Sequence, residues 1–190
     1  MQKELDIRGI TDFEPYSNEI KIKEDKIVLK PINNALYPRI WLGYILAIVI
    51  FTYAVYEVIY LPNSTENITP TYLMLSLAGM FYWLFCVRRI HIILEITTSG
   101  KYSITPSKAA VFHFFPFYNL YWLFKWPNNL ASFLNIQNNS KVQPKGLVGG
   151  ILLIGFIVWK LIDATIGLII LFLAIGYTII IMKKVIPIKE

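Results

Sequence analysis

Charge is scarce in this chain and is confined to a few short segments. Of the 190 residues, 16% are Asp, Glu, Lys or Arg, whereas 56% are hydrophobic. Soluble domains carry about 25% charged residues, spread over their surface. Because the charges here leave long uncharged runs between them, the composition excludes an ordinary soluble domain and favours a membrane protein.

Cysteine and histidine are almost absent. Cys86 is the only cysteine, so a disulfide within the chain is excluded, and its apolar surroundings predict a small buried hydrophobe. His91 and His113 are the only histidines, and neither has partners at metal-ligand spacing. The chain also lacks a nucleophile–base pair, a phosphate-binding loop and a paired acidic site. We therefore expect no catalytic residue, no cofactor and no metal.

A secretory signal is lacking as well. Residues 1–30 are polar and charged, without the apolar core and small-residue cleavage site of a signal peptide. We expect residues 1–39 to form a cytoplasmic segment and the first spanning helix to act as an uncleaved signal-anchor. Within this segment, residues 20–30 alternate apolar and charged side chains around a short polar turn. That alternation makes a small β-hairpin possible.

Long apolar runs define the rest of the chain. A helix needs about 20 apolar residues to cross a hydrocarbon core of about 30 Å. We predict an all-α integral membrane protein with a membrane domain at 40–183 and a cytoplasmic tail at 184–190. Its four transmembrane helices are expected at about 40–61, 71–89, 146–162 and 165–183. The last two form a tight hairpin that turns near Lys160, because one continuous helix would overshoot the bilayer.

The basic residues give the orientation. Seven Lys or Arg precede the first predicted span, seven lie from Arg88 at the end of the second span to Lys145 before the third, and three follow the last. With both termini cytoplasmic, Lys160 is the only one of the 18 basic residues left outside. The same charge attracts the anionic headgroups of a lipid bilayer. No nucleic-acid-binding motif is present, so no nucleic acid is expected as a partner.

A dense aromatic cluster at 112–126 separates the second and third predicted spans. Thr105 and Pro106 predict a helix start ahead of it. Pro116 breaks the helix, Asn119 is placed to cap its second half, and Pro127 predicts another interruption. We therefore predict an aromatic helical hairpin at 105–135 on the cytoplasmic side. Two alternatives stay open, a re-entrant hairpin that lines a cavity and an interfacial belt anchored by aromatic and basic side chains: Trp122, Lys125 and Trp126.

Further candidate functional residues lie where the second predicted helix leaves the membrane. The apolar pattern continues past Arg88 and Arg89, so this helix is expected to extend into water. Arg88, His91 and Glu95 share one face at spacings of three and four, and we predict that His91 pairs with Glu95. His113, in the aromatic cluster, is a further candidate. Gly146 and Gly150 form a small-xxx-small pair that permits close helix packing, including packing between subunits.

The segment TPSKAAVFHFFPFYNLYWLF, residues 105–124, resembles one found in uncharacterised bacterial multipass membrane proteins. Their pattern reads like "SPGKAVGFLFIPFFNLYWIF", and Arg89-Ile90-His91 is similar to the basic "RIH" that precedes it there. The resemblance implies placement in a bacterial inner (plasma) membrane. It implies no activity.

Three functions follow from these patterns. The first is a non-enzymatic structural, accessory or regulatory subunit that acts through self-assembly or a membrane partner protein. The alternative is a small oligomeric channel or transporter component in which the aromatic hairpin lines the path. A third, weaker hypothesis is a membrane enzyme or redox protein that uses His91 and His113.

Overall fold

The computed structural model describes residues 27–60, 69–115, 117–139 and 143–189, and most of them are helical. The chain forms α1 (Ile40–Tyr60), α2 (Pro70–Thr97), α3 (Pro106–Val111), α4 (Tyr118–Asn138), α5 (Leu147–Leu161) and α6 (Ala164–Val185). Short elements accompany them: β1 (Ile32–Asn33), β2 (Ile188–Lys189) and the 3₁₀ helices η1 (Asn34–Leu36) and η3 (Phe112–Phe114). The all-helical class predicted from the apolar runs is thus confirmed, apart from the two short strands.

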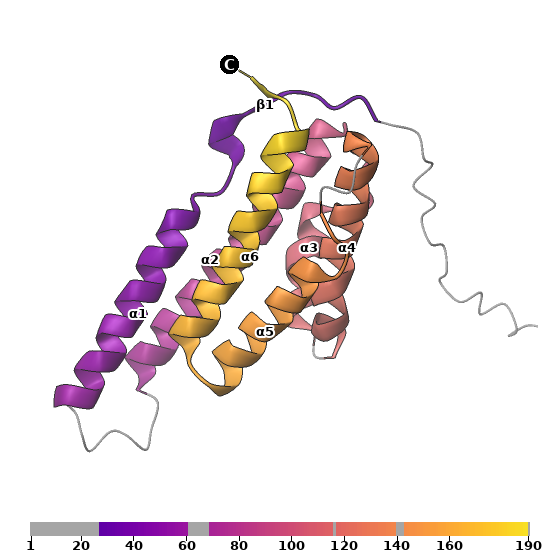
Figure 1. Cartoon of the computed structure of the whole chain (residues 1–190). Coiled ribbons are helices and arrows are strands. Elements are labelled where there is room, and N and C mark those ends of the chain that lie inside the picture. Colours follow the sequence, from indigo (N-terminus) through magenta and orange to yellow (C-terminus); the bar gives the residue numbers. More distant parts are fainter. Residues whose placement is uncertain (1–26, 61–68, 116, 140–142, 190) are drawn as a thin grey trace, which may run out of the picture.

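Three helices, α1, α2 and α6, are long and apolar enough to cross a membrane. α6 is the central one, packing against α1, α2, α4 and α5 (Figure 1). α1 lies at one edge and buries only a narrow stripe, Gly43, Ala47 and Ile50, at the spacing of one helix face. α5 has only 15 residues. It is thus about 22 Å long at 1.5 Å per residue.

A tight turn joins α5 to α6, as the sequence predicts. The Asp163 carboxylate accepts a hydrogen bond from the Ile166 backbone N–H at 2.8 Å and so caps α6. Gly167 lies one turn later, directly against the backbone of Trp159 on α5: a Cβ on Gly167 would be 2.3 Å from the Trp159 Cα. The two helices can approach this closely only because residue 167 has no side chain.

Both ends of the described chain meet at one end of the bundle (Figure 1). β1 pairs with β2 in parallel, with Ile32 opposite Ile188. The Lys30 N–H donates to the Thr97 carbonyl at the end of α2, at 2.9 Å. The predicted β-hairpin lies mostly outside the described residues, and residues 27–30 carry no strand. In the described chain the N-terminal segment pairs instead with the C-terminal tail.

One predicted interruption is wrong. α4 continues through Pro127 to Asn138. Proline in a helix interior costs about 3 kcal/mol, but Pro127 and its neighbour Trp126 are both buried, and their packing outweighs that cost. Near the end of α4, the Asn135 side-chain amide binds the chain that leads to α5, donating to the Gln143 carbonyl at 2.8 Å and accepting from the Gln143 N–H at 2.9 Å.

Candidate functional site: the aromatic hairpin and its cavity

The aromatic hairpin consists of α3, η3 and α4, and local signals start and break it. The Thr105 hydroxyl accepts a hydrogen bond from the Lys108 N–H, and Pro106 occupies the first turn of α3, which confirms the predicted start. Regular helix ends at Val111, and after η3 the chain is extended at Phe115. The predicted break is therefore confirmed, although Pro116 itself lies outside the described residues. Phe117 then starts α4 from a positive φ of 62°, which is rare for a residue with a side chain.

Trp122 closes the hairpin. Its indole Nε1–H donates to the Ala109 carbonyl on α3 at 3.1 Å, and its ring packs edge-on against Phe112, with centroids 4.8 Å apart. Trp122 is buried. Trp122 therefore does not anchor an interfacial belt as that alternative expected, because its indole N–H is bound inside the hairpin. Lys125 does lie at the surface, with its ammonium 5.7 Å from the Tyr121 ring.

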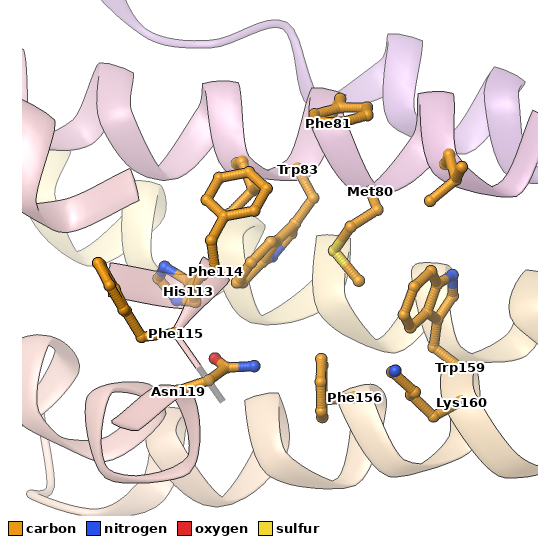
Figure 2. A pocket seen from close by; sticks show the side chains of 12 residues that line it. Met80, Phe81, Trp83, His113, Phe114, Phe115, Asn119, Phe156, Trp159 and Lys160 are labelled. Carbon is orange, nitrogen blue, oxygen red and sulfur yellow. The ribbon is translucent and has the colours of Figure 1, made fainter. Parts of the chain in front are cut away.

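Asn119 does not cap α4, contrary to the sequence prediction. Phe117 occupies the N-cap position, and Asn119 is already the second residue of the helix. Its side chain is 9% exposed, and among the described residues its carbonyl oxygen has no hydrogen-bond partner. Figure 2 shows the Asn119 amide facing the cavity described below. A buried amide without a partner costs free energy, so this oxygen is a candidate for contact with a ligand or water.

Contacts with α2 fix how far the hairpin tip reaches. The rings of His113 and Trp83 meet edge-on with centroids 5.0 Å apart, and Phe114 lies 6.3 Å from Phe81. Arg88 is five residues further along α2 than Trp83. At 1.5 Å per residue, the tip therefore lies about 8 Å from the level of Arg88, measured along the α2 axis toward the start of that helix, and so beside the apolar part of α2.

A cavity of about 350 Å³ lies between α2, the hairpin tip and α5. Met80 and Trp83 line it from α2, Asn119 from the tip, and Phe156 and Lys160 from α5 (Figure 2). Its size falls in the range of about 300–1,000 Å³ that is usual for small-molecule sites. The α2 and α5 walls of this cavity were not predicted from the sequence. The tryptophans within the apolar runs were the available signal, since a buried indole N–H normally needs a partner.

The predicted His91–Glu95 pair is wrong. His91 is fully buried, and its Nδ1 lies 2.9 Å from the Val87 carbonyl of the preceding turn. Its ring packs against Tyr102 and Trp126, with centroids 5.9 and 5.4 Å away, and no residue in the described part of the chain binds its Nε2. Glu95 points to the surface instead.

The polar face predicted around His91 is therefore only partly present. Arg88 is exposed and Arg89 is half-buried, and with Glu95 they remain at the surface. His91 instead belongs to the core beneath the hairpin. Since His113 contacts Trp83 and His91 contacts Tyr102, the two histidines have different neighbours. In residues 27–60, 69–115, 117–139 and 143–189, no three His, Cys, Asp or Glu side chains lie together as metal ligands would.

Gly146 and Gly150 make no close helix contact within the described chain. Gly146 is the N-cap of α5, with φ 83°, and a Cβ at either position would meet no atom within 4 Å. Gly149 packs closely instead, because its Cβ would lie 3.0 Å from the Phe124 Cα on α4. Packing of Gly146 and Gly150 between subunits stays a prediction.

Comparison of the chain with protein families, with curated proteins and with solved structures gave no match, so its function has to be argued from this site.

Proposed function

We propose that this chain is a four-span protein of a bacterial inner membrane, with both termini cytoplasmic and the aromatic hairpin re-entering the bilayer from that side. Three observations support this topology. The hairpin turns back at the level of Phe81 and Trp83, inside the apolar part of α2. The N-terminal strand β1 pairs with the C-terminal strand β2 beside the Thr97 end of α2. The resemblance of residues 105–124 to bacterial multipass proteins supports placement in a bacterial membrane.

The function we propose is that of a non-enzymatic structural or accessory subunit that assembles with a second copy or with a membrane partner through the hairpin tip. The observation that carries it is the irregular conformation of two exposed residues between η3 and α4, Phe115 and Phe117. Phe117 is 89% exposed and has a positive φ, next to the exposed rings of Phe114 and Phe115. Irregular backbone does not occur in contact with lipid, because its polar groups would lack partners. A tip at membrane depth is therefore covered by protein or faces a water-filled cavity, and the exposed phenylalanine rings favour a protein cover.

Photo-crosslinking tests this proposal. A photoreactive phenylalanine analogue in place of Phe117 is expected to give a polypeptide adduct when native membranes are irradiated, because the tip is covered by protein. The matched control is the same analogue in place of Ile59, a 61% exposed residue on α1. Ile59 is expected to give mainly lipid adducts. Lipid adducts alone from position 117 would contradict assembly through the tip.

The alternative, a channel or transporter component, is favoured by one specific observation. Asn119 lines the cavity from the hairpin tip, as a residue that lines a polar path would (Figure 2), and no described residue binds its carbonyl oxygen. Conductance of the purified protein in liposomes distinguishes the two functions: a steady ion current lost in Asn119→Leu would favour the alternative.

A further inference from the structure

Two cavities meet at the outer half of α5. The one described above extends along α2 and α5 from the hairpin tip, and a second, of about 470 Å³, continues to the turn between α5 and α6. Trp159 and Lys160 line both cavities. The Trp159 indole donates to the Ser76 hydroxyl at 3.0 Å, which fixes this shared wall between the two helices. Together the cavities form a groove along α2 and α5.

Lys160 is the only cation in the 37-residue apolar stretch of residues 146–182. Its side chain is exposed, and its ammonium lies 6.0 Å from the Trp159 ring. Asp163 is the nearest acidic residue in sequence, and one of its carboxylate oxygens caps α6. Within the described ranges, no ion pair joins Lys160 to a carboxylate. A lysine in this position favours an anion that comes from outside the chain.

The groove wall beyond Lys160 is apolar. Met80 and Phe156 line the first cavity between Lys160 and the hairpin tip, and Asn119 lies at its opposite end (Figure 2). A cationic group at one end of an apolar cavity is complementary to an amphiphile with an anionic headgroup and a hydrocarbon chain. In a membrane, the abundant molecule of this description is an anionic phospholipid.

We propose that the groove between α2 and α5 binds one anionic phospholipid, with its phosphate at Lys160 and one acyl chain along Met80 and Phe156. The phosphate position at Lys160 lies at the other end of the first cavity from the hairpin tip, although Phe114 and Phe115 of the tip also line that cavity. The proposal rests on the proposed membrane placement but not on the proposed assembly. The acyl chain in the cavity makes the site selective for a lipid over a soluble phosphate ester, because burial of hydrocarbon stabilises only the lipid complex.

Native mass spectrometry of the full-length protein in detergent, titrated with phosphatidylglycerol or phosphatidylcholine, tests the proposal. One phosphatidylglycerol is expected to bind more tightly than phosphatidylcholine. Lys160→Gln should weaken phosphatidylglycerol binding about fivefold, the effect of about one lysine charge at an anionic surface. Lys160→Arg should retain it. Lys184→Gln removes an exposed lysine at the end of α6 and is the matched control, so its affinity should equal that of the parent.

A cavity variant tests the position of the acyl chain. Met80→Trp narrows the first cavity without changing the charge, and it should weaken both lipids. Glycerol 3-phosphate at the same concentration should not compete, because it has no chain. Three results would overturn the proposal: equal binding of the two lipids, an unchanged affinity in Lys160→Gln, or competition by glycerol 3-phosphate, which would identify a soluble phosphate ester as the ligand.

Discussion

Replacing Gly167 with alanine is expected to lower the apparent Tm of the purified protein by roughly 5–10 °C, through a loss of about 2–3 kcal/mol. The new Cβ would lie 2.3 Å from both the Cα and the backbone N of Trp159. Backbone atoms cannot rotate away as the end of a side chain can, so α5 and α6 must separate. Separation would disturb the Asp163 cap and the Trp159–Ser76 hydrogen bond as well.

Gly150→Ala is the matched control for this experiment. Gly150 is also a helical glycine, but a Cβ there would meet no atom within 4 Å. Alanine favours helix over glycine by about 1 kcal/mol, so this variant should be as stable as the parent or slightly more stable. Thermal unfolding in the same detergent measures both variants. Equal stability of Gly167→Ala and Gly150→Ala would contradict the close packing of α5 on α6.

Trp122→Ala is expected to destabilise the protein by about 3–5 kcal/mol, the usual cost of truncating a buried tryptophan. The substitution removes the packing against Phe112 and the hydrogen bond to the Ala109 carbonyl. Trp122→Phe keeps an aromatic ring and loses only the donor, so it should cost about 1 kcal/mol. Because these two contacts join η3 and α3 to α4, Trp122→Ala should also open the hairpin.

Equilibrium unfolding in mixed micelles gives the free energy of unfolding for each variant. Trp41→Ala on α1 is the control, since Trp41 is 55% exposed and its loss leaves little empty space. The account predicts the order Trp41→Ala, Trp122→Phe, Trp122→Ala, from smallest to largest loss. A Trp122→Ala protein as stable as the Trp41→Ala protein would show that Trp122 does not hold the hairpin closed.

Elements with local signals could be predicted from the sequence. Thr105 and Pro106 gave the start of α3, since a capping hydroxyl and a first-turn proline act within a few residues. The extension of α2 to Thr97 followed from its continuing apolar pattern. The turn at Asp163 followed from the length of the apolar stretch. Each of these signals lies within one continuous segment of the chain.

Contacts between distant segments could not be predicted in the same way. β1 and β2 are two residues each, too short for a periodic pattern, and they pair across most of the chain. Pro127 remains in α4 because the interior of the fold packs around it, and a local rule does not contain that packing. His91 lies on the same helix face as the exposed residues Arg88 and Glu95, but isoleucines are its neighbours in the α2 sequence. The sequence alone therefore could not tell whether His91 is buried or exposed.

The candidate site shows the same division. The aromatic hairpin was predicted from its dense aromatic residues, and the break from Pro116. The cavity was not, because its walls come from α2 and α5, which flank the hairpin on either side in the sequence. Asn119 lines the cavity but does not cap α4, the role predicted for it. Its place within the first turn of α4 depends on the backbone of Phe117, which takes a conformation uncommon for phenylalanine.

Cysteine accessibility on both sides of the hairpin tests most directly whether it re-enters the membrane without crossing it. Single cysteines replace Lys101, which precedes the hairpin, Ser140, which follows it, and Ser64, between α1 and α2, in a Cys86→Ala background. A membrane-impermeant reagent is applied to intact cells and to inverted vesicles. The account predicts that positions 101 and 140 label only in inverted vesicles and that position 64 labels only in intact cells. Labelling of positions 101 and 140 from opposite sides would mean that the hairpin spans the bilayer and would contradict the account.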